Sequence, residues 1–117
     1  MLIVDDHEVV RQGLYTFLGS ESDIEIVGEG TDGKKAVHLT RKIVPDVILM
    51  DINMPNMNGI QATRIIHSEF PQIRIIGLSI YEKNGLAAEM INAGASAYRS
   101  KSDNMDLLLS DIRNEVD

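Results

Sequence analysis

Residues 45–51 read PDVILMD, an apolar run that ends on the carboxylate of Asp51. Four consecutive apolar residues, 47–50, are typical of a strand buried on both faces, as in a parallel sheet. The sequence INMPNMNG, which favours a loop, follows at residues 52–59. Open α/β folds place their active sites where a buried strand delivers a side chain to such a loop. Our first hypothesis is therefore that Asp51 is a functional residue.

The same pattern occurs at the start of the chain, where the apolar residues 2–4 end on Asp5 and Asp6. Further short apolar runs, bounded by glycine, proline or polar residues, predict three more strands. They are residues 24–27, 73–78 and 95–98. Stretches with helical spacing separate all of these runs, so the chain predicts five βα units joined by right-handed crossovers into a parallel sheet.

Five βα units have a natural solution, the flavodoxin-like three-layer α/β sandwich with strand order 2-1-3-4-5. In this order the first and third strands are neighbours, so Asp5, Asp6 and Asp51 should converge at one edge of the sheet. Ser79 ends the fourth strand and Lys101 follows the fifth. Both should therefore reach the same edge.

Capping residues and apolar spacing define the predicted helices. The expected N-caps are Asp6 for the first helix and Ser102 or Asp103 for the last, and the second helix opens at Asp32-Gly33. The predicted apolar faces are Val9, Val10, Leu14, Phe17 and Leu18; Ala36, Val37, Leu39, Ile43 and Val44; Ile60, Thr63, Ile65 and Ile66; and Leu107, Leu108, Ile112 and Val116. The residues assigned to the fourth predicted helix are Leu86, Met90, Ile91 and Ala93.

The size of the chain, 117 residues, is that of one compact domain, so we assign residues 1–117 to a single domain. No apolar run approaches the roughly 20 residues needed to cross a bilayer, and no signal peptide precedes the first strand. Cysteine is absent, which excludes disulfides and thiolate metal sites and fits a cytoplasmic location. The net charge of −7 argues against binding of nucleic-acid phosphates by this domain itself.

Three carboxylates within a few ångströms either raise a pKa or hold a divalent cation. Oxygen ligands favour Mg²⁺ first, with Mn²⁺ or Ca²⁺ next. Lys101 would add a positive charge and Ser79 a hydroxyl donor, which suits the oxygens of a phosphoryl group. Asp51 is the best candidate for a nucleophile, because its strand is central and its loop is open, and its product would be an aspartyl phosphate.

Other interpretations of these residues are open at this point. Asp5 and Asp6 alone would be a strand-end turn and a helix cap. His7 beside them invites a transition-metal site, although a position facing solvent in the first turn of a helix is favoured. A phosphatase of the haloacid dehalogenase type also uses a strand-end aspartate, but it needs a second aspartate where Asn53 stands.

A set of short motifs stands in a fixed order along the chain. They are VDD at residues 4–6, the strand that ends at Asp51, Met54-Pro55 with Gly59, Leu78-Ser79, and AGA at residues 93–95 with Tyr98 and Lys101. In order and spacing they resemble the response-regulator receiver domain over essentially the whole chain. Residues 4–14 and 23–29 further resemble the receivers that carry a LuxR-type helix-turn-helix domain downstream.

The resemblance implies a two-component signalling protein rather than an enzyme that acts on an external substrate. Asp51 would accept a phosphoryl group from a cognate sensor histidine kinase. Asp6, Asp51 and the backbone carbonyl of Asn53 would bind Mg²⁺, or Mn²⁺ in its place, while Asp5 would act largely through water. Lys101 would pair with the phosphoryl oxygens. A degenerate receiver that only binds partners would not need this complete set.

The resemblance also implies a conformational switch. Ser79 would hydrogen-bond the phosphoryl group and Tyr98 would turn inward behind it, which would favour a homodimer and control an output such as transcription. Asn53 and Tyr81 would tune how fast water removes the phosphate. DNA would be bound only through a helix-turn-helix domain beyond residue 117, and no membrane contact is implied. Residues 99–100 depart from the family pattern, in which an apolar pair is usual.

Overall fold

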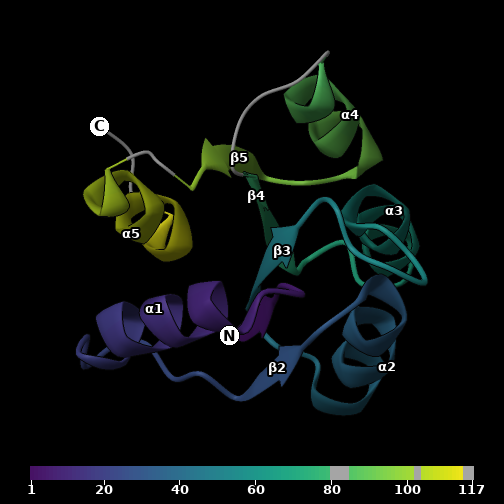
Figure 1. Ribbon diagram of the computed structural model, residues 1–117. Helices are drawn as coiled ribbons and strands as arrows, with labels where there is room; N and C mark the ends of the chain where they lie inside the picture. Colours follow the sequence, from purple (N-terminus) through teal and green to yellow (C-terminus); the bar gives the residue numbers. More distant parts are fainter. Residues whose placement is uncertain (80–84, 102–103, 115–117) are drawn as a thin grey trace.

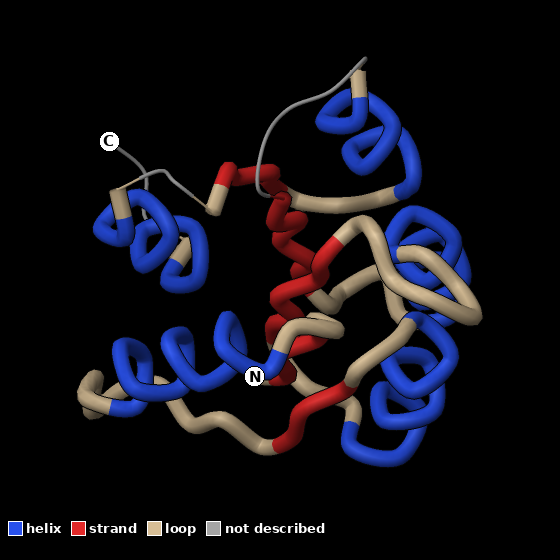
Figure 2. The backbone as a smooth tube through the Cα atoms, viewed as in Figure 1, coloured by secondary structure: helices blue, strands red, loops and turns tan. Residues whose placement is uncertain are grey.

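The computed structural model describes residues 1–79, 85–101 and 104–114. Within these ranges strands and helices alternate, and the strands form one parallel sheet in the order β2-β1-β3-β4-β5 (Figures 1 and 2). The strands are β1 (Leu2–Val4), β2 (Gly28–Gly30), β3 (Val47–Asp51), β4 (Arg74–Ser79) and β5 (Ala97–Ser100). The helices are α1 (Glu8–Gly19), α2 (Gly33–Ile43), α3 (Gly59–Glu69), α4 (Leu86–Ala93) and α5 (Met105–Arg113). The predicted flavodoxin-like α/β fold is confirmed.

Helices cover both faces of the sheet, so the domain has three layers. Figure 1 shows α1 and α5 on one side of the strands and α2, α3 and α4 on the other. Successive residues of β3 point to opposite faces: Leu49 joins the core that contains Leu14 and Leu108, whereas Met50 joins the core that contains Val37 and Ile66. The apolar residues 47–50 are therefore buried because both faces of β3 are covered.

Strand pairing determines where the carboxylates lie. Val4 of β1 pairs with Met50 of β3, and Asp51 pairs with Leu78 of β4. Asp5 follows Val4 directly, so Asp5 and Asp51 are neighbours at the carboxyl edge of the sheet. The predicted convergence of the two strand ends is confirmed. In the part of the chain that the structure describes, no helix has the length and apolar character needed to cross a membrane.

Two strands lie elsewhere than the sequence predicted. β2 consists of residues 28–30 rather than 24–27, because Gly28 and Gly30 are the residues that pair with β1. Ile24 and Ile26 pack instead against the core beneath α1 and α5. β5 begins at Ala97, two residues later than predicted, because Ala97 pairs with Ile76 of β4.

Several helix predictions also need correction. His7 rather than Asp6 is the N-cap of α1, because the Asp5 carboxylate accepts the backbone N–H of His7 and so extends the preceding turn by one residue. Asn104 is the N-cap of α5. The predicted inward residues that are exposed instead are Val9, Ile43, Val44 and Leu107. Ser102, Asp103 and Val116 lie outside the described residues.

Candidate functional site

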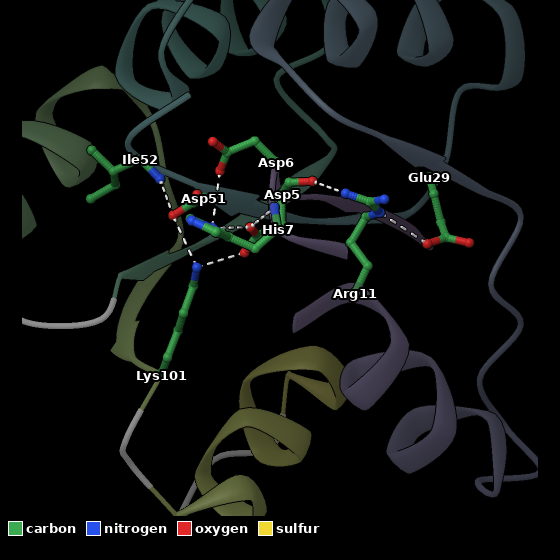
Figure 3. Close-up of polar contacts among 8 residues, drawn as sticks. All are labelled: Asp5, Asp6, His7, Arg11, Glu29, Asp51, Ile52 and Lys101. Carbon is green, nitrogen blue, oxygen red and sulfur yellow. Dashed lines mark hydrogen bonds and ion pairs between the residues drawn. The ribbon is translucent and has the colours of Figure 1, made fainter. Parts of the chain in front are cut away.

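The carboxyl edge of the sheet carries an acidic site formed by Asp5, Asp6 and Asp51 (Figure 3). Asp5 and Asp51 are almost fully buried, at 1% and 4% exposure, whereas the side chain of Asp6 is 30% exposed. One ligand atom from each of these carboxylates and from His7 lies within 4.8 Å of the others. The sequence prediction that the three aspartates meet is confirmed.

Lys101 reaches into this site from the end of β5. Its ammonium lies 2.6 Å from Oδ2 of Asp5 and 3.3 Å from Oδ1 of Asp51. The backbone holds the lysine in place, because the Lys101 N–H donates to the carbonyl of Ser79 at 2.6 Å. One cation therefore bridges the two buried carboxylates, and it comes from a strand that is distant in sequence.

The electrostatics of Asp51 follow from its burial. Loss of solvent raises the pKa of its carboxyl group to about 6, and the nearby charge of Asp5 adds to this effect. The ammonium of Lys101 acts in the opposite direction and lowers the pKa. With this pKa the Asp51 carboxyl group is ionised near neutral pH, but its burial makes the ionised form unfavourable. Further positive charge at the site would therefore stabilise the carboxylate.

Backbone groups fix the orientation of both buried carboxylates. The Ile52 N–H donates to Oδ1 of Asp51 at 2.9 Å, and the His7 N–H donates to Oδ1 of Asp5 at 2.8 Å. The Asp5 N–H in turn donates to the carbonyl of Gly30 at 3.0 Å. The acids are therefore positioned before any ligand binds.

Two residues lie closer to the site than the sequence analysis expected. The Nδ1 atom of His7 is 3.1 Å from an oxygen of Asp5 and 3.1 Å from an oxygen of Asp6, although its side chain is 55% exposed. Arg11 donates to the backbone carbonyl of Asp5 at 2.6 Å and lies 3.4 Å from Glu29. The sequence shows that His7 is adjacent to the aspartates. It carries no signal that Arg11, one helical turn later, contacts the Asp5 backbone.

The remaining predicted site residues lie around this acidic centre. Ser79 is buried at the end of β4, and its backbone is tied to Lys101. Tyr98 packs against the core under α3 and α4, and its buried hydroxyl has no hydrogen-bond partner among the described residues. Asn53 is exposed in the loop after β3. Tyr81 lies outside the described residues.

The donor set fits a hard divalent cation. The carboxylates of Asp5, Asp6 and Asp51 offer oxygen atoms at short mutual distances, which is the ligand type that Mg²⁺ prefers. Two of these groups are buried, and the ammonium of Lys101 lies between them, so a further cation would relieve the repulsion among the carboxylates. Chemically, the site combines an oriented carboxylate, a lysine ammonium and a place for a metal.

Known proteins share this architecture. The family model for the response regulator receiver domain matches residues 1–113. The transcriptional regulatory protein DegU of Brevibacillus brevis is 39% identical over 113 residues, which are 97% of this chain and 48% of DegU. The chain spans about half the length of the curated relatives that it matches.

Solved structures give the same result. A two-component response regulator of the LuxR family from Aurantimonas sp. SI85-9A1 superposes with a TM-score of 0.90 at 32% identity, covering 97% of this chain and 81% of that one. CheY of Borrelia burgdorferi, in a CheX–CheY–BeF3–Mg complex, has a TM-score of 0.88 at 28% identity, covering 97% and 85%. With the family match over residues 1–113, these likenesses show that the chain belongs to the response regulator receiver domain family.

Proposed function

We propose that this domain accepts a phosphoryl group on Asp51 from a cognate sensor histidine kinase and thereby switches an output. One observation carries the proposal: Asp51 ends the buried central strand and lies between an acidic group and the ammonium of Lys101. In the transfer, an oxygen of Asp51 bonds to phosphorus while the bond from phosphorus to the kinase imidazole breaks. The imidazole nitrogen keeps the electron pair.

The proposed metal ligands are Asp6, Asp51 and the backbone carbonyl of Asn53, with Asp5 acting largely through water. Mg²⁺ is the proposed ion, with Mn²⁺ as the alternative, and when bound it neutralises charge on the phosphoryl oxygens. Lys101 pairs with a phosphoryl oxygen, for which it must turn from Asp5. The short distance from Lys101 to both acids supports this role, because the ammonium already lies within reach of Asp51.

The proposed switch runs from Ser79 to Tyr98. The Ser79 hydroxyl would donate to the phosphoryl group, and Tyr98 would pack behind it and change the surface of α4, β5 and α5. The buried hydroxyl of Tyr98 supports this idea. It has no hydrogen-bond partner among the described residues, so a movement of the side chain that gave it one would be favourable. Asn53 and Tyr81 are proposed to tune the rate at which water removes the phosphate.

The proposed output is transcription, through a downstream helix-turn-helix domain. The relative DegU is a transcriptional regulatory protein about twice as long as the matched region, which supports a second domain. A phosphorylation-dependent homodimer would place two such domains on DNA. A cytoplasmic location follows from a role at bacterial DNA, and this domain would bind neither DNA nor membranes itself.

The test is to incubate the purified domain with Mg²⁺ and acetyl phosphate and to measure intact mass. We expect one phosphoryl group per chain, absent from Asp51→Asn and present in Asp46→Asn, which changes an exposed carboxylate at the opposite end of β3. Beryllofluoride with Mg²⁺ should bind with the same dependence on Asp51. Repeated turnover of a phosphoester would favour a phosphatase, and a chain that takes no phosphoryl group would be a binding module only.

A further inference from the structure

The loop between β3 and α3 is fastened at its far end to the start of α2. The Asn56 amide donates to Oδ2 of Asp32 at 2.9 Å, and the Gly33 N–H donates to the carbonyl of Met57 at 2.9 Å. We call these four residues, Asp32, Gly33, Asn56 and Met57, the loop latch. Asp32 is buried and also caps α2, because its Oδ1 accepts the Lys35 N–H at 2.8 Å. The latch therefore joins the β3–α3 loop to the first residues of α2.

The latch has a demanding geometry, which indicates that it is a specific contact. Asn56 has a φ of +65°, a left-handed conformation that asparagine and glycine tolerate best. A Cβ atom on Gly33 would collide with the backbone carbonyl of Met57, so only glycine allows the helix end to approach the loop this closely. Hydrogen bonds from the Lys35 N–H and the Asn56 amide lower the pKa of Asp32, so the latch contains an ionised acceptor.

The latch holds the loop that carries Asn53 against the start of α2, which follows β2, the strand beside Asp5. Asp32 lies two residues after Gly30, whose carbonyl accepts the Asp5 N–H at 3.0 Å. At the other end of the loop, the Gly59 N–H donates to the carbonyl of Ile52 at 2.8 Å. Asn53 therefore lies between two fixed points, the base of the loop and the latch, and one of them is bonded to the strand of Asp5.

We propose that Asp32 and Asn56 are positioning residues, which set the place of the Asn53 carbonyl and thereby the affinity of the acidic site for Mg²⁺. The inference rests on the proposed function, because it needs a metal at Asp6 and Asp51. Neither Asp32 nor Asn56 touches the ion. Groups that orient metal ligands from outside the coordination sphere commonly change metal affinity when they are removed.

The test measures Mg²⁺ affinity directly, by amide chemical shifts and calorimetry, together with the midpoint of thermal unfolding. Asn56→Gly keeps the left-handed backbone and the net charge but deletes the amide. We expect it to bind Mg²⁺ roughly tenfold more weakly than the wild type, the low end for loss of a group that orients a metal ligand. Asn114→Gly is the matched control: Asn114 also has a left-handed backbone, with a φ of +56°, but it is the C-cap of α5 and lies outside the latch, so affinity should stay near the wild-type value.

The swap Asp32→Asn with Asn56→Asp restores a donor and an acceptor in reverse, at unchanged net charge, and should recover wild-type affinity. Equal Mg²⁺ affinity in Asn56→Gly and the wild type would overturn the latch proposal, even if the variant unfolds at a lower temperature. A swap that stays as weak as Asn56→Gly would overturn it too. Absence of Mg²⁺ binding and phosphorylation in the wild type would overturn the proposed function as well, so the two failures are distinguishable.

Discussion

The ammonium of Lys101 lies 2.6 Å from Oδ2 of Asp5, although 96 residues separate them in sequence. Both side chains are largely buried, with 13% exposure for Lys101 and 2% for Asp5. A buried ion pair of this kind does more than stabilise the fold, because the same ammonium is 3.3 Å from Asp51. In the proposed mechanism the ammonium must leave Asp5 for the phosphoryl group. It also lies beside Asp51, a proposed metal ligand, so lysine and metal would compete for the Asp51 carboxylate.

Lys101→Met separates these roles. Removing the ammonium leaves two buried carboxylates unpaired, so we expect a stability loss of about 3–5 kcal/mol without metal and a further rise in the pKa of Asp51. Mg²⁺ should bind at least as tightly as in the wild type, because its competitor is gone. Phosphorylation by acetyl phosphate should be slower by about 10²-fold. Calorimetry measures the stability and the Mg²⁺ affinity, and mass spectrometry measures the phosphorylation rate. A phosphorylation rate equal to that of the wild type would contradict the proposed role of Lys101.

Asp51→Asn should change the pH dependence of stability. Burial raises the pKa of Asp51 from 3.8 to about 6, so between these values the folded chain holds a proton that the unfolded chain has released. Wild-type stability therefore falls as pH rises through this window. In EDTA we expect Asp51→Asn to be more stable than the wild type by about 1–3 kcal/mol at pH 7.5, with little difference near pH 3.5.

Urea unfolding at the two pH values measures this prediction. Asp46→Asn is the control, because Asp46 is an exposed carboxylate just before the same strand. A gain in Asp51→Asn that is equal at both pH values would show that ionisation of Asp51 is not its cause.

Mg²⁺ should stabilise the folded domain. A cation that binds only the folded state adds about 1.4 kcal/mol at ten times its dissociation constant. We expect this gain in the wild type and a much smaller one in Asp6→Asn, because a proposed ligand is lost. Unfolding in MgCl2 and in NaCl of equal ionic strength measures the effect. Equal stabilisation by both salts would indicate general screening rather than a site.

Gly59→Ala tests how closely the loop is packed. A Cβ atom at Gly59 would collide with the backbone carbonyl of Asp51, so the substitution should cost more than about 2 kcal/mol and displace the strand end. Gly13→Ala is the matched control, because Gly13 lies on α1 with no atom within 4 Å of the new Cβ. Alanine there should stabilise by roughly 0.5–1 kcal/mol. Thermal unfolding of both variants measures the contrast.

The fold followed from local patterns where burial was complete. Asp51 ends a run that is apolar at every position, and this predicts a central strand without any knowledge of its partners. β2 could not be located in this way, because Gly28 and Gly30 carry no apolar signal and are strand residues only through pairing with Leu2 and Val4. The alternating residues 24–27 were misleading, since Ile24 and Ile26 are half-buried against the core shared by α1, α5 and the sheet but lie outside β2.

The acidic site was predictable from local patterns too, whereas the hydrogen bonds that hold the neighbouring loop were not. Asp5, Asp6 and Asp51 each end a short apolar strand, so the strand order alone brings them together. The latch between Asp32 and Asn56 depends on a side chain 24 residues away and on a left-handed backbone, and neither feature leaves a periodic signal in the sequence.

The burial of Asp51 also bears on how new signalling partners arise. Asp51 ends β3, which pairs with β1 on one side and with β4 on the other, so its backbone stays in place when a partner approaches. A buried carboxylate of this kind can contact a phosphoryl group but little of the molecule that carries it. Discrimination between donors must then come from the surrounding helix surfaces. Under the proposed function, those surfaces can diverge while the chemistry at Asp51 is unchanged, so surface substitutions alone would change which phosphoryl donor the domain accepts.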